Sequence, residues 1–137
     1  MCLSAFTWAK FRSTKGGMKV HTQLDFKTAI PEFTRITKVS SIHEINVLDI
    51  IHYVKDSFYV LGLGYADFER LHHIHKYGAF FIIRAKDNLN FSRIYSHEVD
   101  KSKGVYSDQT IRLNGFYSVK EYPDKLRRIK FYDEVND

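Results

Sequence analysis

Residues 58–83 constrain the fold of this chain more than any other stretch. FYVL (58–61) is a short apolar run typical of a β-strand, and a glycine-rich turn follows it. Asp67 is suited to cap the start of a helix over residues 68–77. AFFII (79–83) is apolar throughout, which predicts a short strand buried on both faces. A strand, a helix and a strand in this order predict two parallel strands of an α/β sheet.

The same stretch predicts how its helix packs and where it ends. Phe68, Leu71 and Ile74 recur at helical spacing and should face the sheet. Gly78 suits the left-handed conformation that often follows the last turn of a helix. The helix is therefore expected to place one apolar face on the strands beside it.

Two strands and a further helix are predicted before this stretch. MKVHTQLDF (18–26) alternates as a strand does, and a second short strand is expected to follow Pro31. The shared face of the first strand is formed by Val20, Thr22 and Leu24. Ser41 and Glu44 have the spacing of a capping box, which predicts a helix that runs to about Val54. The inward face of that helix is formed by Ile45, Leu48, Ile51 and His52.

The remainder of the chain predicts a β-rich antiparallel extension. Four stretches typical of short strands are separated by turns: FSRIYSHEV, GVYSDQTIRL, GFYSVKEY and LRRIKFYDEV. The turn signals are Lys103-Gly104, Asn114-Gly115 and Pro123-Asp124.

Length and composition allow one domain with a real core. The chain has 137 residues, of which 44% are hydrophobic. We expect a single domain over residues 1–137, with an α/β part at 1–90 and the β-rich extension at 91–137. The single cysteine, Cys2, excludes an internal disulfide framework and a cysteine-based zinc site. The sequence has neither an apolar run long enough for a membrane span nor the order of a signal peptide, so a cytoplasmic location is expected, with no membrane partner.

The positive charge is concentrated near the N-terminus. Net charge is +5, and residues 1–39 carry all of it, with seven Lys and Arg against two acidic residues. A polyanion such as DNA is the functional interpretation, and a solubilising basic face is the alternative. The expected DNA-binding side chains here are Lys10, Arg12, Lys15 and Lys19. Trp8 precedes Lys10, and Phe11 lies between Lys10 and Arg12. Such a mixture of aromatic and basic side chains suits contact with a nucleic acid backbone and stacking on bases, although both rings can equally anchor the segment to a core.

The turn after FYVL carries the most specific motif. Gly64, Tyr65, Asp67, Phe68 and Leu71 match a pattern of the DDE transposases of the insertion-sequence-four type. In that pattern an apolar strand is followed by Asp, any residue, Gly-Tyr, any residue, Asp-Phe and a helix. The chain resembles this family over nearly its whole length. The other matching segments are residues 2–25, IPEFTRIT, VLD (47–49), 78–91 and 96–118.

The resemblance implies a ribonuclease-H-like domain, a mixed sheet with flanking helices, that cuts and rejoins DNA. In the intact family two Asp and one Glu hold two divalent metals, Mg or Mn, that polarise the scissile phosphate. The implied partners are the DNA ends of the mobile element. Proteins of this kind work as assemblies, so a homo-oligomer is also implied.

Gly62 occupies the position of a catalytic Asp in this pattern. The family's first Asp falls just before the segment that begins at Met1, and its third acidic residue falls beyond Asp137. We therefore expect a partial catalytic domain that is inactive as it stands and holds no cofactor of its own. Unpaired strand edges should also leave it marginally stable or prone to aggregation.

Arg84 and Lys86 follow the second strand of the central stretch. Alternation places them on one face, near the strand end at Gly62, where an active relative would meet DNA phosphates. The alternative is a surface ion pair with Asp87 or another acidic residue. The helix before this strand carries His72, His73 and His75, which suit either a polar helix face or, with a third partner, a metal site.

Two further functions stay open from the sequence. One is a residual DNA-binding fragment that inhibits an intact relative, which the basic N-terminal segment favours. The other is an active nuclease that uses substitute carboxylates, for which Asp25, Asp49 and Asp67 are the candidates. Asp67 has a competing role as a helix cap.

Overall fold

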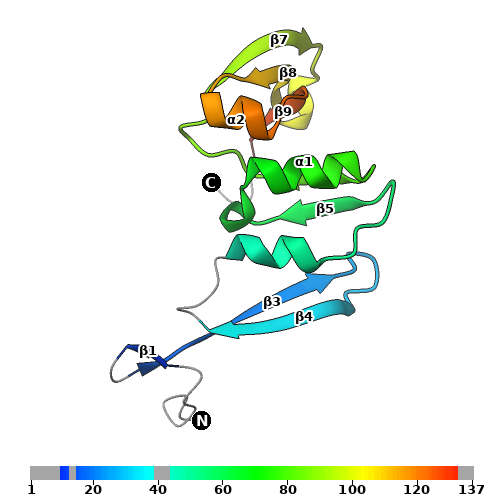
Figure 1. The fold of residues 1–137 in the computed structure, drawn as a ribbon. Helices are drawn as coiled ribbons and strands as arrows, with labels where there is room; N and C mark the ends of the chain where they lie inside the picture. Colours follow the sequence, from blue (N-terminus) through cyan, green and yellow to red (C-terminus); the bar gives the residue numbers. More distant parts are fainter. Residues whose placement is uncertain (1–9, 13–14, 39–43, 133–137) are drawn as a thin grey trace. The chain divides into compact units, whose positions relative to one another are not determined.

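The computed structural model describes residues 10–12, 15–38 and 44–132 (Figure 1). The chain divides into two compact units, Met1–Tyr53 and Val54–Asp137, and each is described by itself. The sequence instead predicts one domain, with the boundary between its α/β part and its β-rich extension at residues 90 and 91. Ser41, the expected helix cap, and Trp8 lie outside the described residues.

The first unit is built around an antiparallel hairpin of β3 (Met18–Leu24) and β4 (Pro31–Lys38), and a smaller pair, β1 (Lys10–Arg12) and β2 (Lys15–Gly16), precedes it. The prediction of both longer strands is confirmed. Val20 lies opposite Ile36 in the register, and Thr22 opposite Thr34.

The polar face of this hairpin is the buried one. His21 and Thr37 are buried, with His21 Nε2 and Thr37 Oγ1 3.1 Å apart. Val20, Leu24 and Ile36, on the other face, are each more than half exposed. The strand period was therefore predicted correctly, but the period alone does not tell which face is covered.

The helix after the hairpin is shorter than predicted. It is a 3₁₀ helix, η3 (Glu44–Ile50), and does not continue to Val54. Leu48 is buried as expected, but His52, assigned to the inward face, is exposed, and Tyr53 is buried in its place. The Tyr53 hydroxyl donates to the Leu48 carbonyl at 2.9 Å, which satisfies a carbonyl that a longer helix would have paired with a backbone N–H.

The second unit begins with the predicted strand–helix–strand motif. β5 (Phe58–Leu61) and β6 (Phe80–Ile83) are parallel, and α1 (Phe68–Lys76) connects them after a 3₁₀ turn, η4 (Leu63–Tyr65). Asp67 caps α1 as predicted, because its carboxylate accepts from the Arg70 N–H at 3.0 Å. Gly78 has φ +84°, which confirms the left-handed position after the helix.

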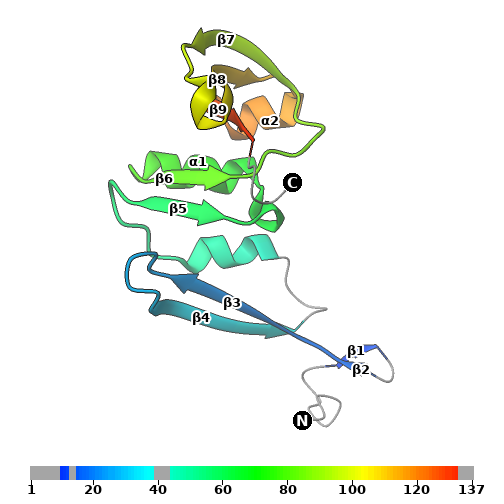
Figure 2. The ribbon, with the colours of Figure 1, turned by 180° about the vertical axis from the view of Figure 1, so that it is seen from behind.

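The prediction that β6 is buried on both faces is wrong. The helix α1 covers one face of the parallel pair (Figure 1). Leu71 and Ile74 of α1 are buried, as is Ala79 just before β6. Figure 2, seen from behind, shows the other face with no helix of this unit over it. The residues on that open face are Phe58, Val60, Phe80 and Ile82, between 50% and 77% exposed. One helix can cover only one side of a sheet, so the apolar run alone predicted too much burial.

The predicted β-rich extension is confirmed as an antiparallel sheet of β7 (Phe91–His97), β8 (Val105–Leu113) and β9 (Leu126–Phe131), with β8 in the centre. A 3₁₀ turn, η5 (Lys101–Lys103), and Gly104, with φ +75°, connect β7 to β8. Ile111 and Leu113 of β8 are almost completely buried.

One expected strand of this extension is a helix. GFYSVKEY forms α2 (Phe116–Glu121), and Gly115 is its N-cap residue at φ −63° instead of a hairpin turn residue. The Val119 and Tyr122 N–H groups donate to the carbonyls of Gly115 and Ser118 at 2.8 and 2.9 Å, so the backbone is paired locally.

The described strands form four separate sheets, three of two strands and one of three. The fold is therefore mixed α/β with few helices, and none of these sheets is closed. No helix in the described part of the chain has the length and apolar character needed to cross a bilayer.

Candidate functional site

The carboxyl ends of β5 and β6 form the candidate site. The two strands are in parallel register, with Leu61 opposite Ile83, so Gly62 and Arg84 leave the sheet side by side at the same edge. Lys86 follows Arg84 by two residues, beyond the end of β6. We call these three residues, Gly62, Arg84 and Lys86, the Gly62 edge.

Gly62 lies in extended backbone and faces open space. Its φ and ψ are −68° and 157°, which any L-residue can adopt. A Cβ built at this position would meet only Tyr65 Cδ2, at an ordinary contact distance of 3.9 Å. The residue before the turn is therefore not required to be glycine by the backbone or by packing.

The cations of the Gly62 edge face solvent. Arg84 and Lys86 are both exposed. Within residues 44–132, neither side chain has an ion pair or hydrogen bond, and the alternative ion pair between them and Asp87 is not formed. The structure thus places Arg84, one of the two cations that the sequence assigned to DNA, beside Gly62, and Lys86 follows two residues later in the chain.

The nearest acidic residue in the motif is already engaged. Asp67 caps α1 through one carboxylate oxygen, and its other oxygen lies 3.4 Å from Arg70 Nη1. Asp25 and Asp49, the other substitute carboxylates, belong to the first unit. Asp25 accepts from the Lys27 N–H at 2.8 Å, and this hydrogen bond lowers its pKa. Asp67, the candidate carboxylate in the same unit as the Gly62 edge, is therefore already engaged as a helix cap and ion-pair partner.

The donor set does not fit the divalent metals of the resembled family. Mg²⁺ and Mn²⁺ need several oxygen ligands, and carboxylates supply them in proteins. The Gly62 edge offers two cations and a residue without a side chain. Among the described residues, no group of three or more His, Cys, Asp or Glu side chains could hold a metal ion.

The second set of predicted DNA-binding residues lies in the first unit. Lys10 and Arg12 lie in β1 and Lys15 in β2, but their side chains fall outside the described residues. Lys19 lies on β3, half-buried, on the same face as His21. This set lies in the first unit and the Gly62 edge in the second, so each is considered as a candidate surface by itself.

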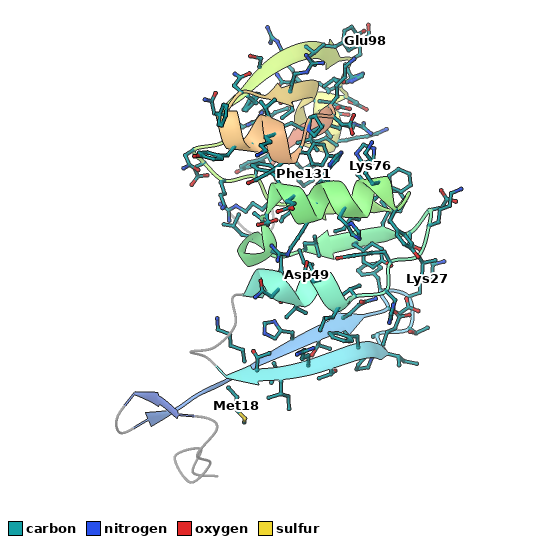
Figure 3. All side chains as sticks on the ribbon, viewed as in Figure 1. Met18, Lys27, Asp49, Lys76, Glu98 and Phe131 are labelled. Carbon is teal, nitrogen blue, oxygen red and sulfur yellow. The ribbon has the colours of Figure 1, made fainter. Side chains whose placement is uncertain are left out.

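Sequence reasoning missed a polar clasp between α1 and the segment after α2. His72 Nε2 lies 3.0 Å from Asp124 Oδ2, and His75 Nδ1 lies 2.8 Å from the Tyr122 hydroxyl. Lys76, labelled near the end of α1 in Figure 3, adds a third contact, with its Nζ 3.8 Å from Asp124 Oδ2. The histidines were recognised as a polar helix face, but their partners lie about fifty residues away, and no local pattern could pair them.

The clasp has defined electrostatics. Burial raises the pKa of Tyr122 to about 12, and the nearby Asp124 charge adds to this. The hydrogen bond from His72 lowers the pKa of Asp124, and Lys76 contributes through its charge. Tyr122 therefore stays a neutral phenol and Asp124 a carboxylate at neutral pH, which suits a structural contact between two elements.

Comparison of the chain with protein-family models, with curated proteins and with solved structures finds no match.

Proposed function

We propose that this chain is a DNA-binding protein of DDE-transposase ancestry that does not itself cut DNA. The supporting observation is the Gly62 edge, where a strand end that resembles a catalytic position carries glycine. Arg84 and Lys86 of this edge are exposed and have no ion pair or hydrogen bond within residues 44–132. The strand, turn and capped helix of the motif all form as the resemblance predicts. The order of hairpin, helix and parallel strand pair supports a ribonuclease-H-like origin for residues 1–90.

The chemistry of the edge favours phosphate binding over phosphate cleavage. Arg84 and Lys86 can donate to phosphate oxygens, and such contacts position a protein on DNA without reading its sequence. Cleavage of the family type needs metal-bound water at carboxylates, and Gly62 supplies no ligand. The proposed activity is therefore sequence-tolerant, salt-dependent binding.

Fluorescence anisotropy with a labelled DNA duplex tests this proposal. The double variant Arg84→Ala, Lys86→Ala should bind several-fold more weakly and lower the salt-dependence slope by about two. The matched control is Lys125→Ala, Lys130→Ala, which removes the same charge from exposed positions before and within β9. An absence of binding at low salt, or equal losses in both variants, would contradict the proposal.

A nicking assay separates this proposal from an active nuclease. With supercoiled DNA and Mg²⁺ or Mn²⁺, we expect no nicking above the background of a mock preparation. Metal-dependent nicking that disappears in Asp67→Ala would establish the nuclease instead.

A second candidate function is inhibition of an intact relative. The parallel pair of β5 and β6 supports it, because two strands leave two edges open to pairing with another chain. Added in excess, the chain should lower strand transfer by such a relative, and the Arg84→Ala, Lys86→Ala variant should still do so if pairing rather than DNA competition is responsible.

A further inference from the structure

We infer that the Gly62 edge binds DNA phosphate directly and without divalent metal ions. This inference rests on the proposed function and specifies how its site works. It predicts that the absence of a carboxylate at position 62 preserves the preference of the edge for anions.

The side chains of the Gly62 edge do not suit a metal centre. A metal bridge between protein and phosphate needs carboxylates on the protein side. The Gly62 edge has none, and Asp67, the nearest acid of the motif, is held by the α1 N-terminus and by Arg70. The side chains that the edge itself offers to a phosphate are therefore those of the two cations, Arg84 and Lys86.

The register of the strands places Gly62 beside Arg84. Gly62 and Arg84 are the residues that directly follow the pair Leu61 and Ile83. Neighbouring strands lie roughly 4.8 Å apart, so a carboxylate at position 62 would lie within ion-pair reach of Arg84. It would compete with phosphate for the guanidinium and would also repel the phosphate. Glycine removes that competition.

The edge can be tested without disturbing the fold. The backbone at Gly62 is extended, and a Cβ there meets only Tyr65 Cδ2 at 3.9 Å. Gly62→Asp and Gly62→Asn have side chains of nearly equal size and differ in charge. Both should keep the far-ultraviolet circular dichroism and melting temperature of the natural chain, which provides the check on folding.

The experiment measures the dissociation constant for one labelled duplex in EDTA and in Mg²⁺, at matched ionic strength. The natural chain and Gly62→Asn should bind equally, within about twofold, in both buffers. Gly62→Asp should bind roughly three- to tenfold more weakly in EDTA. Mg²⁺ should restore part of this loss for Gly62→Asp alone, since only that variant gains a negatively charged carboxylate ligand beside the phosphate.

The outcomes separate this inference from the proposed function. If the natural chain binds DNA only when Mg²⁺ is present, the inference is wrong while the proposed function stands. Equal affinities of Gly62→Asp and Gly62→Asn in EDTA would also overturn it, since the charge at position 62 would then be irrelevant. If the natural chain binds DNA in neither buffer, the proposed function fails, and the inference fails with it.

Discussion

The rings of Phe58 and Phe80 stack across the parallel pair β5–β6, with centroids 4.8 Å apart and an angle of 22° between the planes. This contact lies on the face that α1 does not cover, and both side chains are at least half exposed. Together with Val60 and Ile82 they form one continuous apolar surface, which we call the open face. Parallel strands are normally covered on both sides, so we expect this surface to favour self-association.

The first prediction concerns association through the open face. Val60→Thr, Ile82→Thr should lower light scattering and dye binding by exposed apolar surface at high protein concentration, because it makes the open face polar and keeps β-branched side chains. The control is Ile94→Thr, Ile129→Thr, which changes two exposed isoleucines of the three-stranded sheet. An equal reduction by the control would show that total apolar exposure matters and the open face does not.

The second prediction concerns the small core under α1. Ile74 is completely buried, so Ile74→Ala should lower the free energy of unfolding by about 2–5 kcal/mol, measured by urea denaturation. A domain is stabilised by only about 5–15 kcal/mol in total, so part of the helical signal should already be lost in buffer. Val60→Ala, at a position that is 77% exposed, should change stability by less than about 0.5 kcal/mol. Similar effects of the two substitutions would contradict the assignment of the core.

Local sequence signals correctly predicted those features of the fold that depend on residues close together in the chain. The Asp67 cap, the inward Leu71 and Ile74, and the left-handed Gly78 all depend on residues within one helix and its ends. The burial of β6 depends on which elements cover the two faces of its sheet. The segment after Gly115 forms the helix α2, whereas its sequence pattern predicted a strand after a hairpin turn. Tertiary packing determines both the burial of β6 and the conformation of residues 116–121, and a strand-like sequence pattern does not contain this information.

The candidate site was predictable to the same extent. Gly62 and Arg84 could be placed at one edge because parallel strands end together, and the structure pairs the residues just before them. The clasp could not be predicted, because His72 and Asp124 are distant in sequence and meet only after α2 has formed. Charge alone also did not distinguish Lys19, which has an interaction partner, from Arg84, which has no ion pair or hydrogen bond within residues 44–132.

The third prediction concerns the Tyr122 contact of the clasp. Tyr122 is only 3% exposed, and its hydroxyl lies 2.8 Å from His75 Nδ1. Tyr122→Phe should lower the free energy of unfolding by about 1 kcal/mol, because it removes this hydrogen bond and keeps the packing of the ring. Circular dichroism in a urea titration measures the effect. An unchanged midpoint would mean that the hydroxyl is equally well satisfied by water.

The fourth prediction concerns acid. The hydrogen bond from His72 lowers the pKa of Asp124 below its ordinary value of 3.8, so the carboxylate form is favoured in the folded chain. Its contribution to stability is therefore complete at pH values above 3.8 and is lost as the pH falls through the lowered pKa. Asp124→Asn should reduce the melting temperature at pH 7 and flatten its decline below pH 4. If the melting temperatures of the natural chain and of Asp124→Asn declined in parallel as the pH falls, the contribution of Asp124 ionisation to stability would be contradicted.

The fifth prediction compares two glycines with opposite backbone requirements. Gly104 has φ +75°, and a Cβ there would lie 2.9 Å from the Tyr132 carbonyl oxygen, whereas Gly62 has φ −68° and open space around it. Gly104→Ala should therefore destabilise by more than about 1 kcal/mol through strain and contact with fixed backbone. Gly62→Ala should be neutral or stabilise by about 0.4–1 kcal/mol, because alanine has fewer conformations in the unfolded chain. Urea denaturation of both variants measures these effects. Destabilisation by Gly62→Ala would mean that position 62 needs glycine for structural reasons, and that it is not free to carry a metal ligand.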